Sequence, residues 1–199
     1  TPEIYTLSLH DALPISPYFK AREGSGHGYD ITNHNALNPE VGSRRQFDDL
    51  VEGLARLGMG QILDIVPNHM CVESGDNHWW LDVMENGPSS PYASFFDIDW
   101  NPVKRELKNK VLIPILGDQY GAVLESGELH LVYSEGAFHL CYYEHTFPII
   151  PKTYVSILSY RLEELEQSIG EENTRYQELL SIMTALDHLP PYTETDPDR

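Results

Sequence analysis

The sequence has little cysteine, little positive charge and no long hydrophobic run. Of 199 residues only Cys71 and Cys141 are cysteines, and they form no C-x-x-C pair, so neither a disulfide framework nor a zinc-binding motif is indicated. No stretch approaches the roughly 18 apolar residues of a membrane span, and the N-terminus lacks the basic segment of a secretory signal. These absences predict a cytoplasmic protein without membrane association.

Basic residues are outnumbered, with 13 Lys and Arg against 31 Asp and Glu and a net charge of −18. Such a surface repels phosphate backbones, so no nucleic-acid partner is expected. The histidines show no H-x-x-x-H or H-E-x-x-H spacing, which argues against a metal site. A hydrophobic share of 41% is enough for a folded core.

The first fifteen residues, TPEIYTLSLHDALPI, show no sustained periodicity and no helix cap. Residues 6–15 match one reading frame of a common sequencing-adapter oligonucleotide. We therefore predict that residues 1–15 are an assembly artefact outside the fold. The alternative is a genuine strand with a polar edge.

A loop, a helix and a buried strand follow in order. Residues 16–42 are rich in Gly, Pro, Asn and Asp, which predicts a loop. Ser43 can cap a helix that ends at Gly58, and its apolar stripe consists of Phe47, Leu50, Val51, Leu54 and Leu57. Residues 61–66, QILDIV, read as a buried parallel strand in which Asp64 needs a polar partner.

Residues 75–152 differ in composition from the residues before them and are predicted to be an inserted subdomain. Two alternating runs flank Ser134 to Ala137 and predict a β-hairpin. Residues 153–190 carry two apolar stripes and are expected to form a pair of helices, separated at Gly170. Residues 191–199 are polar and Pro-rich, as in a linker or truncated tail.

The strongest chemical signal is the run Asp64-Ile-Val-Pro-Asn68-His69 at the end of the predicted strand. It delivers a carboxylate, an amide and an imidazole to one rim, and these groups suit sugar hydroxyls. The spacing of these residues is equally consistent with a turn that has only a structural role.

Tyr29, in the loop HGYD, could stack on a sugar ring or simply pack in its loop. Trp79, Trp80 and Trp100 are candidates either for sugar platforms or for the core of the insertion.

The order GYDITNHNALNPEVG, helix, ILDIVPNH resembles the α-amylase family from its second barrel strand to its DxVxNH segment. The runs SPYFKAR, LDIVPNHM and ENGPSSPYASFFDIDW resemble one branch of that family, the maltooligosyltrehalose synthases. The resemblance implies an α/β fold, a partial (β/α)8 TIM barrel with a long β-rich and helical insertion after the third strand. It also implies a retaining mechanism in which an Asp nucleophile and a Glu acid convert a reducing-end α-1,4 bond of a maltooligosaccharide to α,α-1,1.

By position, the resemblance assigns substrate binding to Tyr29, Asp64, Asn68 and His69. It implies no cofactor, and no metal, because these synthases do not share the calcium site of some amylases. Asn33 departs from the pattern, since the family usually has Asp there. The G-x-R-x-D segment of the nucleophile does not occur after Asp64, so no catalytic residue is expected in this chain and it should be inactive alone. Two alternatives are another glucan hydrolase or transferase of the family and a non-catalytic binding module derived from a barrel.

Overall fold

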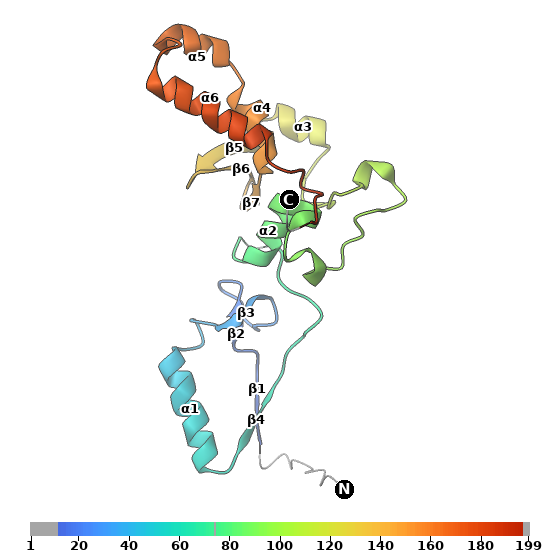
Figure 1. Cartoon of the computed structure of the whole chain (residues 1–199). Coiled ribbons are helices and arrows are strands. Elements are labelled where there is room, and N and C mark those ends of the chain that lie inside the picture. Colours follow the sequence, from blue (N-terminus) through green and yellow to red (C-terminus); the bar gives the residue numbers. More distant parts are fainter. Residues whose placement is uncertain (1–11, 74, 197–199) are drawn as a thin grey trace. The chain divides into compact units, whose positions relative to one another are not determined.

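The computed structural model describes residues 12–73 and 75–196, which divide into two compact units (Figure 1). Unit 1 runs up to His78 and holds strands β1 to β4 and helix α1. Unit 2 begins at Trp79 and holds the sheet β5–β6–β7 and most of the helices. No helix of the described residues is long and apolar enough to cross a membrane. The subdomain boundaries expected at residues 75 and 153 stay predictions.

Unit 1 contains a parallel pair of strands, β1 (Ala12–Ile15) and β4 (Gly60–Leu63). The Asp64 backbone N–H donates to Ile15 O at 2.9 Å and extends the ladder beyond β4. The prediction that residues 1–15 lie outside the fold is wrong for residues 12–15, because a strand partner can bind an extended backbone whatever its side chains. Residues 1–11 lie outside the described residues, so an adapter origin stays a prediction.

The segment predicted as a loop contains two short antiparallel strands, β2 (Phe19–Ala21) and β3 (Ile31–Leu37). Lys20 lies opposite Asn33 and Ala21 opposite Ile31 in this pair. The loop prediction is therefore wrong for these residues. The polar composition of β3 did not indicate a strand, because only its first two side chains, Ile31 and Thr32, are buried.

Helix α1 (Arg44–Arg56) confirms the prediction and lies beside the β1–β4 pair (Figure 1). The Ser43 hydroxyl accepts from Gln46 N at 3.3 Å, and Ser43 N donates to Gln46 Oε1 at 2.8 Å, which completes a capping box. Gly58 follows the helix with φ +68°, a conformation that glycine adopts without strain. Of the predicted stripe, Leu54 is buried, whereas Leu57 at the C-cap is 75% exposed.

Strand β4 stops at Leu63, three residues before the predicted end at Val66. The pairing ends with the bond from Asp64 N to Ile15 O because Ile15 is the last residue of β1, and Pro67 further along has no backbone N–H that could extend it. Asp64 is consequently exposed, not surrounded by apolar neighbours as its predicted place in the strand implied.

The predicted hairpin in unit 2 is confirmed. Strands β5 (Leu129–Ser134) and β6 (Ala137–Tyr142) pair antiparallel around Glu135 and Gly136, whose φ values of 53° and 85° define a type I′ turn. A third strand, β7 (His145–Pro148), pairs with β6 and was not predicted, because four residues carry too little alternation.

Residues 153–190 were predicted to form two helices. They form three, which are α4 (Tyr154–Leu158), α5 (Leu162–Ile169) and α6 (Thr174–Asp187). The first predicted helix is broken at Arg161, whose φ of 57° is left-handed. The unit also contains α2 (His78–Asn86), α3 (Tyr120–Glu125) and four 3₁₀ helices, η1 (Gly87–Ser89), η2 (Ala93–Phe95), η3 (Arg105–Leu107) and η4 (Pro151–Thr153).

Buried tyrosines contribute much of the core of unit 2, and each has a partner for its hydroxyl. Tyr142 Oη accepts from Gly117 N at 2.9 Å, and Tyr154 Oη accepts from Phe138 N at 3.1 Å. Tyr176 Oη donates to Glu166 Oε2 at 2.9 Å and so joins α6 to α5. These bonds offset the cost of burying a phenol.

Candidate functional site

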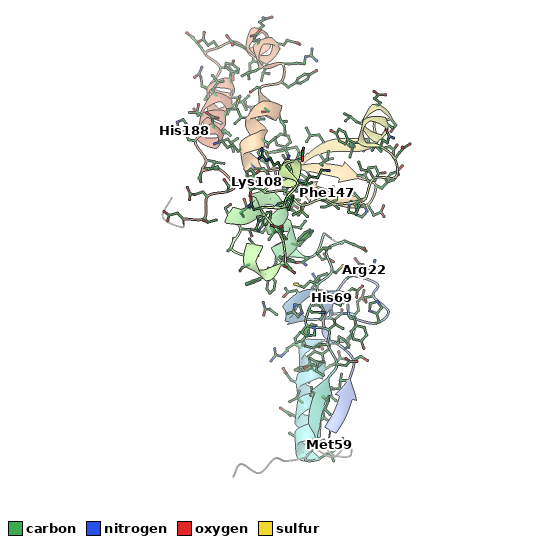
Figure 2. The ribbon with its side chains drawn as sticks, turned by 90° about the vertical axis from the view of Figure 1, so that its right-hand side faces the viewer. Arg22, Met59, His69, Lys108, Phe147 and His188 are labelled. Atoms are coloured by element: carbon green, nitrogen blue, oxygen red, sulfur yellow. The ribbon has the colours of Figure 1, made fainter. Side chains whose placement is uncertain are left out.

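The candidate site lies at the end of unit 1 where β4 finishes. Figure 2 shows Arg22 and His69 at one end of this unit and Met59, which precedes β4, at the other. The carboxyl end of a parallel strand is where α/β proteins place their functional loops. At this end Tyr29 of the loop 22–30 is in direct contact with Asp64 of the run Asp64–His69.

Tyr29 and Asp64, 35 residues apart in sequence, are joined directly. Tyr29 Oη donates to Asp64 Oδ2 at 2.6 Å. The bond to the carboxylate, with smaller contributions from desolvation and from the charge of Asp64, raises the pKa of Tyr29 above its ordinary value. The partner that the sequence required for Asp64 is thus the tyrosine of the other motif.

The HGYD loop is shaped so that Tyr29 is held in place. Gly28 has φ +76°, and a Cβ there would lie 3.0 Å from Pro17 O, so only glycine fits without a shift. The rings of His27 and Tyr29 stack with centroids 5.7 Å apart and planes 24° apart. His27 therefore covers one side of the Tyr29 ring, and Tyr29 as a whole is half-buried.

The His27 ring has two polar neighbours within the loop. Tyr29 N donates to His27 Nδ1 at 3.1 Å, which requires an unprotonated Nδ1. A charged pair with Asp30 Oδ1 would need the opposite state, and its distance is 3.8 Å. The bond from Tyr29 N is the shorter of the two contacts, and a ring that accepts it carries its proton on Nε2.

Asp30 fixes the other side of the loop. Burial acts to raise the pKa of Asp30, but hydrogen bonds from Ser25 Oγ, its own backbone N–H and Arg22 outweigh it, so the pKa lies below the ordinary value. Arg22 Nε lies 3.2 Å from Asp30 Oδ2. Asp30 is therefore charged, and its bonds to Ser25 and Arg22 hold the loop together next to Tyr29.

Asn68 and His69 form a second pair, with Asn68 Oδ1 and His69 Nδ1 3.2 Å apart. An amide oxygen can only accept, so His69 Nδ1 carries the proton and Nε2 of the neutral ring is an acceptor. Both side chains are exposed. Two depressions of unit 1 are lined by β2, β3 and α1, and neither includes Tyr29, Asp64, Asn68 or His69.

Two residues that anchor the loop after His69 were not predicted from the sequence. Cys71 N donates to Ile31 O at 2.9 Å, which ties the chain after His69 to strand β3. Asn77 is fully buried, and its Nδ2 donates to Cys71 O at 2.8 Å. The burial of Asn77 is not visible in the sequence, so no sequence signal pointed to this anchor.

Asn33, the departure from the usual Asp, accepts from Asn35 N at 2.8 Å through Oδ1. A carboxylate could accept the same bond, so an Asp at this position could keep this contact within β3. Within residues 12–73 and 75–196, no group of three His, Cys, Asp or Glu side chains is arranged to hold a metal ion.

A strand, a helix and a parallel strand with polar side chains at the carboxyl end define unit 1 as an α/β unit. The chain belongs to the α-amylase family, since residues 6–124 match the family model described as the alpha amylase catalytic domain.

Within that family the chain is similar to maltooligosyl trehalose synthases. A crystal structure of such a synthase superposes with a TM-score of 0.61 at 33% identity, over 69% of this chain and 18% of that one. The synthase of Arthrobacter ramosus gives a TM-score of 0.58 at 37% identity, over 70% and 17% of the two chains. A Mycobacterium tuberculosis protein provisionally named as this synthase is 39% identical over 142 residues.

These relatives are much longer than the matched region. The alignment with the Mycobacterium tuberculosis protein covers 63% of this chain and 17% of the relative. The chain thus corresponds to about one sixth of the length of the proteins that it resembles.

Proposed function

We propose that this chain is part of a maltooligosyltrehalose synthase, and that Tyr29, Asp64, Asn68 and His69 form one wall of its pocket for the reducing-end glucose. The observation that carries the proposal is the 2.6 Å bond between Tyr29 Oη and Asp64, which unites the two motifs of the family resemblance. The similarity to the synthases supports the substrate class, a maltooligosaccharide.

The geometry suggests a separate task for each side chain. Asp64 holds the Tyr29 hydroxyl, and His27 covers one ring face, so the other face can receive the C–H side of a glucose ring. His69 offers Nε2 as an acceptor for a sugar hydroxyl while Asn68 fixes its orientation. These residues bind and position the sugar.

The glycosyl transfer itself is assigned to carboxylates outside this chain. The retaining mechanism implied by the family needs a nucleophile and an acid about 5–5.5 Å apart. Of the two carboxylates described beside Tyr29, Asp64 holds the tyrosine hydroxyl and Asp30 is paired with Arg22. We accordingly assign β1, α1 and β4 to a partial (β/α)8 barrel, and the residues from about 75 to an insertion in it. By itself the chain binds and does not convert substrate.

The test is the activity of the longer protein on maltopentaose after substitution at Asp64. Asp64→Asn should lower the rate of substrate conversion about 10- to 100-fold, because a hydrogen bond to a charged group contributes roughly 1.5–3 kcal/mol. The matched control is Tyr143→Phe, which removes a similar exposed bond of 2.9 Å to Glu128 in unit 2. Equal rates for Asp64→Asn and this control would refute the assignment.

A further inference from the structure

Three aromatic rings at the start of unit 2 form a cluster that plays no part in the site of unit 1. Trp79 and Tyr92 stack with centroids 5.7 Å apart and planes 13° apart. Phe95 meets Trp79 edge-on at 5.2 Å and Tyr92 at 5.8 Å. Phe95 is nevertheless 59% exposed. We call these three residues the aromatic platform.

Hydrogen bonds to the backbone fix the turn that carries two of the platform rings, Tyr92 and Phe95. Tyr92 and Phe95 stand three residues apart across the 3₁₀ turn η2, a spacing that places them on the same side. The buried Ser90 accepts from Tyr92 N through Oγ at 3.1 Å and from Ala93 N through its carbonyl at 3.0 Å. The run SPYASFF therefore places Tyr92 and Phe95 on one side of η2, and Trp79 of α2 packs against both.

The size of the platform excludes a stable protein partner as its occupant. An aromatic side chain buries at most about 150–250 Å², so three of them fall short of the roughly 800 Å² per partner of a stable interface. A sugar residue is about the size of one ring. The platform therefore matches a small ligand with a flat apolar face.

The negative charge of the chain restricts the class of ligand further. The chain carries a net charge of −18, and Asp97 and Ser94, exposed beside Phe95 in sequence, offer acceptors for hydroxyl groups. An anionic ligand would be repelled. A neutral ligand with C–H faces and hydroxyl edges fits both features.

We propose that the aromatic platform is a second glucan-binding site, which holds a distant part of a maltooligosaccharide chain. The identity of the sugar rests on the proposed function, whereas the site itself rests on Trp79, Tyr92 and Phe95. The run ENGPSSPYASFFDIDW thereby gains a role in substrate binding separate from Tyr29 and Asp64.

The test is electrophoresis of the 199-residue chain through native gels containing glycogen, with dextran gels as the reference. Glycogen should retard the wild-type chain, and Phe95→Ala should weaken the apparent affinity about five-fold or more. Phe95→Leu keeps an apolar side chain without a ring face and should lose as much, which separates stacking from misfolding. Tyr120→Ala, at an equally exposed aromatic of unit 2, should change nothing.

Two results would overturn the proposal. One is the absence of retardation of the wild-type chain by glycogen. The other is equal retardation of the wild-type chain and Phe95→Ala, or equal retardation in glycogen and dextran. Retardation lost in Phe95→Ala but retained in His69→Ala supports the platform even if the longer protein proves inactive on maltopentaose, so its failure and that of the proposed function remain distinguishable.

Discussion

At the scale of single residues, the bond between Tyr29 and Asp64 should be visible in the titration of the Tyr29 phenol. Its folded pKa is raised above the ordinary value of 10.0, so the stabilisation that the bond provides is complete below about pH 10 and is lost as pH rises through the raised pKa. Asp64→Asn should bring the pKa of Tyr29 back toward 10. Carbon-13 NMR of the tyrosine ring measures this shift, and Tyr143, whose pKa is raised by Glu128, should keep its value.

Gly87 should tolerate no side chain. Its φ is 57°, and a Cβ would lie 2.7 Å from Tyr192 Cδ2, where the chain after α6 packs against η1. Gly87→Ala should lower the free energy of unfolding of unit 2 by about 2 kcal/mol or more, measured by urea denaturation. Gly121→Ala, in open space within α3, should have no cost. An equal loss in both variants would contradict the role given to Tyr192.

Residue identity predicted the polar groups of the site but not their surroundings. Asp64 has a partner, as the sequence predicted, but the predicted reason was wrong, because Asp64 is exposed beyond the end of β4 and not buried within it. Its exposure and the bond to Tyr29 depend on where β4 leaves the ladder, which a spacing pattern does not encode. Cys71 and Asn77 were missed because Cys71 acts through a backbone bond to Ile31 of β3 and Asn77 through a side-chain bond to Cys71 O, and no spacing pattern encodes either bond.

At the scale of elements, the start of α1 should depend on the Ser43 hydroxyl. Ser43→Ala removes the acceptor for Gln46 N and should destabilise the first turn by about 1 kcal/mol, whereas Ser43→Gly should cost only a few tenths. Hydrogen exchange of the amides of Gln46 and Phe47 measures the change. Unaltered exchange in Ser43→Ala would show that the capping box contributes nothing.

Elements with strong local signals were predictable, and those set by tertiary contacts were not. Helix α1 has a cap, an apolar stripe and a terminal glycine, and the β5–β6 hairpin has a two-residue turn. Strand β1 exists because β4 pairs with it, and β2 and β3 pair despite polar composition. The break at Arg161 interrupts a stripe that is continuous in sequence.

At the scale of the whole molecule, the apolar face of α1 remains largely uncovered. Leu50, Val51 and Leu57 of the predicted stripe are exposed, as is Ile62 of β4. In a closed barrel both the helix and the strand would be covered by neighbouring α/β units. This exposure supports the proposal that the described fold is one section of a larger barrel.

The most direct test of the central claim is proton NMR of maltopentaose during incubation with the longer protein. A maltooligosyltrehalose synthase should remove the anomeric signals of the reducing end and produce an α,α-1,1 linkage, with no matching release of glucose. A rise in reducing ends or in free glucose would mean net hydrolysis and would contradict the proposed function.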